Sequence, residues 1–152
     1  YACHIFPCFL SCIERSGCPA QTGMHGREPS SHPCEAALLT GVAVDDVESA
    51  RRAAASLRTL VRRAAVVRLR ELGAVFAIGD ESGHVPAFAI EVHGTTGVGD
   101  AFRAALTFAL PSGRHFRDAV TLGNAAGSLA VHALKETFSL PNGDAVTKLA
   151  GW

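Results

Sequence analysis

Hydrophobic residues recur at helical spacing across residues 45–64, which is the most regular pattern in the chain. Such a stripe predicts an amphipathic surface helix, with Asp45 or Asp46 as its N-cap. The arginines lie largely off this face, and we interpret them as a solvated surface. The preceding residues 33–41, "PCEAALLTG", predict a shorter helix with Gly41 as its C-cap. The apolar face comprises Val47, Ala50, Ala54, Leu57 and Val61.

Three apolar segments with strand-like composition follow, at residues 65–69, 74–79 and 84–92. The residues "DESG", 80–83, predict the turn between the second and third strands. Beyond a glycine-rich loop, apolar periodicity predicts two helices, and a last helical turn or two follows Pro141. Strands and helices combined in one layered unit predict an α/β fold. The two helices are expected at 100–110 and 116–134.

Residues 1–31 differ from the rest, because they are rich in Cys, Pro, Ser and Gly and have no periodicity. We interpret them as an irregular leader to the domain at residues 32–152. Whether this leader belongs to the native protein stays open. The cysteine spacing fits a zinc site poorly and no secretory signal is recognised, so reduced thiols and a cytoplasmic location are expected. Four of the five cysteines lie in this leader: Cys3, Cys8, Cys12 and Cys18.

Composition fits a single packed domain, with 152 residues of which 48% are hydrophobic and 18% are charged. Fourteen basic and fourteen acidic residues cancel, so no strong field favours nucleic acid or a membrane surface as a partner. No apolar run approaches the roughly 18 residues that a membrane span requires.

The glycine-rich loop at residues 94–102, "GTTGVGDAF", carries the candidate chemistry. If a helix begins near Asp100, the unpaired amides before it and the helix dipole form an anion site. An aspartate beside such a site can accept the proton of an attacking hydroxyl during phosphoryl transfer. Spacing alone also allows an ordinary strand-to-helix turn in which Asp100 only caps the helix.

The sequence "TTGVGDAFRAAL" resembles the signature of the ribokinase-like (PfkB) carbohydrate kinases, D-T-x-G-A-G-D-x-F. Three further segments resemble family motifs in the family's order: "HPCEAALLTG", "LGNAAGSLAV" and "SLP". The resemblance runs from about residue 32 to the end of the chain. It implies an ATP-dependent kinase that uses Mg²⁺ and phosphorylates a hydroxyl of a small sugar.

The resemblance also implies a role for each matching residue. Asp100 is the catalytic base, and Glu35 helps to organise Mg²⁺ and the phosphates. The anion hole comprises the amides of Gly97, Val98 and Gly99. Nucleotide contacts are assigned to Gly73, Thr95, Thr96 and Asn124. His93, beside the loop, is expected to be structural or solvent-facing rather than catalytic.

Several positions depart from the family pattern. Gly94 stands where the motif has its first aspartate, which argues against activation by a monovalent cation. The family's nucleotide loop, T-L-G-x-x-G, reads "RLRELG" at residues 68–73, so only Gly73 is retained. Arg68 and Arg70 therefore either serve the phosphates in another way or lie at the surface.

Length is the largest departure, because family members are about twice as long and bind the sugar through their first half. The chain resembles the C-terminal half of an α/β/α sandwich, and we expect an uncovered sheet edge and an exposed apolar face that favour a homo-oligomer. Two alternatives stay open. One is a non-catalytic remnant that binds nucleotide weakly or packs with a partner. The other is a vitamin kinase of the pyridoxal or hydroxymethylpyrimidine type.

Overall fold

The computed structural model of the chain describes residues 32–61, 63–91, 97–133 and 141–152. Five α-helices, two short 3₁₀ helices and three strands occur in these residues, in the order that the sequence predicts for its helices and strands. The elements are α1 His32–Thr40, α2 Val47–Leu60, β1 Ala64–Arg68, η3 Arg70–Leu72, β2 Ala74–Ile78, β3 Glu81–Val85, α3 Val98–Ala109, η4 Leu110–Ser112, α4 Phe116–Ala133 and α5 Gly143–Ala150.

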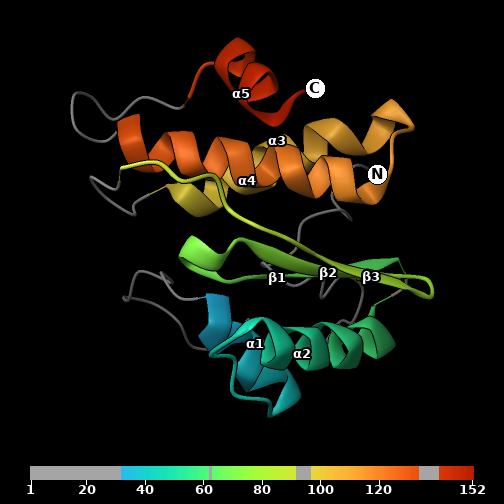
Figure 1. Cartoon of the computed structure of the whole chain (residues 1–152). Helices are drawn as coiled ribbons and strands as arrows, with labels where there is room; N and C mark the ends of the chain where they lie inside the picture. Colours follow the sequence, from blue (N-terminus) through green and yellow to red (C-terminus); the bar gives the residue numbers. More distant parts are fainter. Residues whose placement is uncertain (1–31, 62, 92–96, 134–140) are drawn as a thin grey trace.

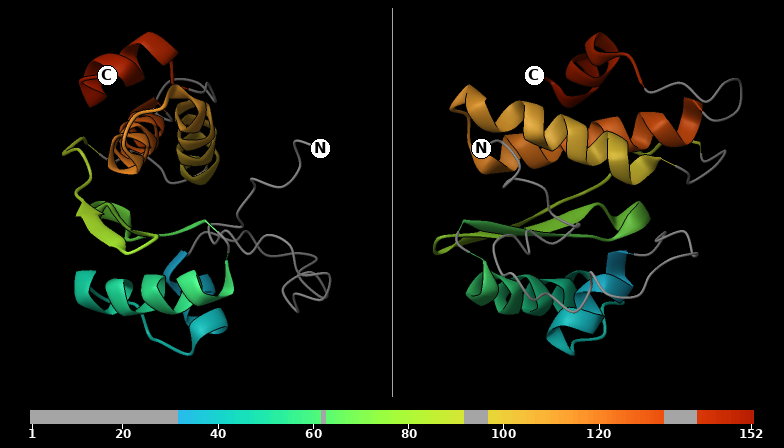
Figure 2. Two further views of the ribbon diagram at one scale, coloured as in Figure 1. Left: turned by 90° about the vertical axis from the view of Figure 1, so that its right-hand side faces the viewer. Right: turned by 180° about the vertical axis from the view of Figure 1, so that it is seen from behind.

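The elements form three layers with the sheet in the middle (Figure 1). Helices α1 and α2 cover one face, and α3 and α4 cover the other, as the two further views also show (Figure 2). Helix α5 packs against α4 on the side away from the sheet. The predicted α/β class and the α/β/α layering are therefore confirmed.

The three strands pair antiparallel in the order β1–β2–β3. Side chains alternate between the two faces of a strand, so neighbouring residues enter different layers. Val66 and its partner Phe76 lie in the core beneath α3 and α4, whereas Val67 and Val75 lie in the core beneath α1 and α2. The sheet thus separates two apolar cores.

Both faces of the sheet are covered, so the expectation of an exposed apolar face is wrong. All five residues of β1 are buried, and four of the five residues of β2 are buried. The helices of each layer supply the covering side chains. Strands β1 and β3 are the outer strands of the sheet in the described residues, and self-association through an edge stays a prediction.

Capping predictions for the first two helices are confirmed. Asp46 is the N-cap of α2, where its carboxylate accepts a hydrogen bond from the Ser49 amide at 2.7 Å. The Ser49 hydroxyl oxygen accepts a hydrogen bond from the Asp46 amide, which completes a capping box. Hydrogen bonds from the Ser49 side chain and backbone lower the pKa of Asp46. Gly41 ends α1 with φ +71° and donates to the carbonyl of Ala37 at 2.8 Å.

The third strand begins earlier and ends earlier than predicted. Its bounds are Glu81–Val85, the turn before it lies at Gly79 and Asp80, and residues 86–91 are not in a strand. Pro86 has no N–H to continue the ladder. Gly83, which the sequence placed in the turn, is a strand residue paired with Phe76, and a Cβ there would lie 2.7 Å from the Phe76 ring, so a larger residue would not fit.

Helices α3 and α4 pack closely against each other and against the sheet. A Cβ built at Gly123 of α4 would lie 2.9 Å from the Phe102 ring of α3, so the glycine permits this close approach. The bounds of both helices agree with the prediction to within two residues. None of the helices that the structure describes has the length and apolar character to cross a membrane.

Candidate functional site

Helix α3 opens directly behind a glycine in the left-handed conformation. Gly97 is its N-cap, with φ +76° and ψ −7°, and its carbonyl accepts from the Ala101 amide at 2.9 Å. The amides of Val98, Gly99 and Asp100 belong to the first turn, where an α-helix provides no acceptor. The predicted helix start near Asp100 is confirmed, and the positive end of the helix dipole lies at this loop.

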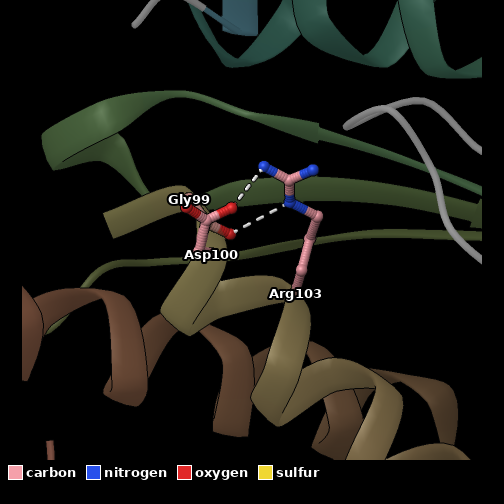
Figure 3. A network of polar contacts seen from close by, with 3 residues as sticks. All are labelled: Gly99, Asp100 and Arg103. Carbon is pink, nitrogen blue, oxygen red and sulfur yellow. Dashed lines mark hydrogen bonds and ion pairs between the residues drawn. The ribbon is translucent and has the colours of Figure 1, made fainter. Parts of the chain in front are cut away.

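Asp100 is exposed at this first turn and pairs with an arginine one turn along. Arg103 Nη2 lies 2.7 Å from the Asp100 carboxylate, and its Nε donates to the Gly99 carbonyl at 3.3 Å (Figure 3). The Asp100 side chain is 73% exposed and that of Arg103 is 27% exposed. Sequence reasoning missed Arg103, although an aspartate followed three residues later by an arginine on a helix is a recognisable pair.

A cavity of about 570 Å³ lies beside this helix start. Its volume is within the usual range for small-molecule sites. Three predicted site residues line it: Gly73 and Asn124, predicted to contact the nucleotide, and Val98, predicted for the anion hole. They come from the loop before β2, from α3 and from α4, so the fold gathers them from distant parts of the sequence.

Gly73 and Asn124 also contact the end of β3 and the segment after it, which forms part of the cavity wall. Gly73 has φ +92°, and a Cβ there would lie 2.1 Å from the carbonyl oxygen of Val85. The buried Asn124 donates from Nδ2 to the carbonyls of Val85 and Pro86, at 2.9 and 3.1 Å. Both residues therefore have a structural role, and their predicted contacts with a nucleotide stay a prediction.

The two arginines of the "RLRELG" loop line the same cavity but differ in exposure. Arg68 is only 5% exposed, so the reading of this residue as a surface arginine is wrong. Its guanidinium carbon lies 5.4 Å from the centroid of the Phe102 ring, a cation–π distance. Arg70 is exposed, at the start of η3.

Several predicted residues lie outside what the structure describes. His93, Gly94, Thr95 and Thr96 are in the undescribed segment 92–96. Glu35 belongs to α1, but its side chain is outside the described part. Within the described residues, no three His, Cys, Asp or Glu side chains gather at a distance that would hold a metal.

An α/β/α sandwich with a glycine turn, a helix N-terminus and an adjacent cavity defines a class of protein suited to binding anionic small molecules. Comparison with known families is more specific. The model of the pfkB family carbohydrate kinases matches residues 34–142. This chain belongs to that family.

Individual relatives agree with the family and show how much of them the chain represents. The ribokinase of Staphylococcus aureus is 30% identical over 108 residues, which are 70% of this chain and 36% of that protein. The bifunctional protein HldE of Geobacter sulfurreducens is 37% identical over 99 residues, 64% of this chain and 20% of that protein.

A solved structure of Arabidopsis thaliana ribokinase, complexed with ribose and ATP, matches with a TM-score of 0.69 at 28% identity. The match covers 79% of this chain and 39% of that one. The chain therefore spans between one fifth and two fifths of the length of these relatives. Its fold corresponds to part of the ribokinase fold.

Proposed function

We propose that this chain supplies the nucleotide-side portion of an ATP-dependent kinase that phosphorylates a hydroxyl of a sugar or sugar-like substrate. The observation that carries the proposal is the start of α3. Gly97 turns the chain so that first-turn amides and the Asp100 carboxylate are presented together, and the carboxylate is exposed. Family membership and the resemblance to a ribokinase complexed with ribose and ATP support the substrate class.

In this proposal Asp100 takes the proton of the acceptor hydroxyl as its oxygen attacks the terminal phosphorus of ATP. The bond from that phosphorus to the bridging oxygen breaks, and ADP leaves with the electron pair. The amides of Gly97, Val98 and Gly99 stabilise the negative charge that spreads over the equatorial oxygens. The cavity beside Val98 holds the nucleotide, with Gly73 and Asn124 in its wall. Thr95 and Thr96 are proposed as further nucleotide contacts on the strength of the family motif.

Magnesium is the metal expected with ATP, and its role is to neutralise charge on the phosphates. The carboxylate of Glu35 is a hard oxygen ligand of the kind that Mg²⁺ prefers. Arg103 keeps the Asp100 carboxylate in one orientation at the helix start. We further propose that the kinase acts in the cytoplasm.

A second candidate function, nucleotide binding without catalysis, is favoured because the chain matches only part of the length of its relatives. The match covers 36% of the S. aureus ribokinase, and we propose that segments outside the matched part select and position the acceptor sugar. By itself the chain would then bind nucleotide without turnover. The vitamin-kinase alternative has less support, because the relatives include enzymes named ribokinase and deoxyribokinase.

Calorimetric titration with MgATP tests the nucleotide site in the chain itself. We expect weak binding, in the millimolar range, and no ADP release with ribose or fructose in a coupled assay. Robust turnover by the chain alone would contradict the proposal that the acceptor sugar is positioned by segments outside the matched part. Absence of binding at several millimolar ATP would contradict the nucleotide site.

A chimaeric enzyme tests whether Asp100 is the catalytic base. Residues 32–152 replace the corresponding portion of S. aureus ribokinase, and Asp100→Asn is compared with the unmodified chimaera. Asparagine keeps the size and capping ability of aspartate but accepts no proton, so we expect turnover to fall by at least ~10²-fold with little change in ATP affinity. Asp144→Asn, in the first turn of α5, is the matched control and should leave turnover unchanged. Near-normal turnover in Asp100→Asn would refute the assignment.

A further inference from the structure

The η3 turn between β1 and β2 borders two cavities. Arg70 and Glu71 line the cavity of about 570 Å³ described above, and they also line a second cavity of about 360 Å³ together with Leu69 and Leu72. Arg70, Glu71 and Leu72 are all exposed. A segment with exposed side chains and open space beside it has little packing to hold it, so its position depends on its hydrogen bonds.

Backbone hydrogen bonds inside the turn determine its shape. The Leu69 amide donates to the Gly73 carbonyl at 2.7 Å, and the Leu72 amide donates to the Leu69 carbonyl at 3.0 Å. The Gly73 amide donates to the Arg70 carbonyl at 3.1 Å. Each of these bonds joins two residues of the same short segment, so they close the turn without fixing how it is inclined to the sheet.

A histidine of β3 joins the turn to the sheet. Nε2 of His84 lies 2.6 Å from the carbonyl oxygen of Leu72, and because a carbonyl only accepts, the ring N–H is the donor. His84 is held in turn by α4, since Nη1 of Arg117 donates to the His84 carbonyl at 3.0 Å. The guanidinium carbon of Arg117 lies 5.5 Å from the centroid of the Phe76 ring. The turn is thereby connected to the sheet and to α4 through one imidazole.

We propose that His84 is a positioning residue for the larger cavity, acting through Leu72 on the η3 turn. His84 does not line that cavity, so it sets the position of the wall without touching a ligand. The second cavity is the space into which the turn can move when the bond to Leu72 is absent. This inference rests on the proposed function, because the cavity is the one assigned to the nucleotide.

Two substitutions of His84 test this role by calorimetric titration of the whole chain with MgATP, at a temperature at which every variant is folded. His84→Leu removes the donor, so the turn spends less time in the position that fits the ligand, and the affinity for ATP should fall about fivefold. His84→Gln places an amide N–H where the imidazole N–H was and should retain most of the affinity. Rescue by glutamine would show that the hydrogen bond, rather than the ring, is what matters.

Amide hydrogen exchange without ligand shows where the loss of this bond is felt. In His84→Leu the amides of Leu72 and Gly73 should exchange faster, while those of β2 keep the rates of the unmodified chain. A general loss of stability would instead accelerate exchange across the sheet. His115→Leu is the matched control, because His115 is exposed and lines neither cavity, and it should change neither the exchange rates nor the affinity.

The outcomes separate this inference from the proposed function. If the unmodified chain binds ATP and His84→Leu binds it equally well, the inference is wrong and the nucleotide site stands. An equal loss of affinity in His84→Gln, or faster exchange throughout β2, would also overturn it, because His84 would then support the sheet rather than the turn. If the unmodified chain binds no ATP, the proposed function is refuted and this inference fails with it.

Discussion

The carboxylate of Asp100 and the guanidinium of Arg103 lie 2.7 Å apart across the first turn of α3. Arg103 also donates to the Gly99 carbonyl, so one arginine contacts two adjacent residues of the first helical turn. Asp100 remains 73% exposed in this pair. Exposed pairs of this kind orient side chains more than they stabilise a fold.

We therefore predict that Asp100 and Arg103 are only weakly coupled in stability. A double-mutant cycle with Asp100→Asn and Arg103→Met should give a coupling free energy of about 0.5 kcal/mol or less. Urea unfolding of the four proteins measures it, and Arg103→Lys is the control that keeps the charge. A coupling above about 2 kcal/mol would mean that the pair holds the helix start in place.

Gly73 and Gly113 differ both in backbone conformation, with ψ −131° and +4°, and in the space beside them, and both differences make alanine more costly at Gly73. Both have positive φ, but a Cβ at Gly113 meets nothing within 4 Å, whereas one at Gly73 meets the Val85 carbonyl at 2.1 Å. Gly113→Ala should cost about 1 kcal/mol in the free energy of unfolding. Gly73→Ala should cost at least about 2 kcal/mol more. Equal losses in denaturant unfolding would contradict the close approach.

Asn124 is predicted to stabilise the segment after β3, independently of any ligand. Asn124→Ala removes two hydrogen bonds to the carbonyls of Val85 and Pro86 and should cost about 2 kcal/mol. Ser128→Ala, which removes a single longer bond of 3.4 Å to Phe88, should cost less. Thermal unfolding without ligand compares them. If Asn124→Ala unfolds at the normal temperature and only ATP binding suffers, the residue serves the ligand alone.

Acid should weaken the start of α2 through Asp46. Its pKa in the folded chain is lowered from the ordinary 3.8, mainly by the Ser49 hydroxyl, so the folded state binds this proton less readily than the unfolded state. The contribution to stability is therefore present above the ordinary pKa and is lost as the pH falls through the lowered value.

Asp46→Asn removes this titration while an amide oxygen can still cap the helix. The melting temperature of the unmodified chain should exceed that of the variant most at about pH 6, and the difference should shrink toward about pH 2. A difference that stays constant across this range would show that the charge of Asp46 contributes nothing. Asp45→Asn is the control, since Asp45 does not cap the helix.

Local signals in the sequence predict most of the fold. Helix α2 follows from its apolar stripe and from Asp46, and the turn into α3 follows from Gly97. The start of the third strand is mispredicted because a glycine such as Gly83 fits a turn as well as a strand. As a turn residue it marks a chain reversal, but here it lies in the strand so that Phe76 and Arg117 can occupy the space beside it. That requirement arises only from tertiary packing.

The same limit applies to the candidate site. The motif identifies Asp100 and its glycines, because the helix start depends on residues that are adjacent in the chain. Nothing local marks Arg68 as buried, since its place against Phe102 depends on how α3 packs on the sheet. The positive φ of Arg70, +54°, is likewise set by the hydrogen bonds of the turn that contains it.

The separation of the two cores has a consequence for inherited variation in this protein. Among the described residues, the core beneath α3 and α4 borders the cavity, through Phe88, Val98 and Phe102, whereas no member of the other core lines it. A substitution in the other core, at Leu57 or Val75, would reduce how many folded molecules a cell accumulates while each survivor works normally. Raising gene dosage would rescue such an allele. An allele altered at Phe102, which is buried in the core beside the cavity, would combine a loss of folded molecules with a change in the cavity wall that dosage does not restore.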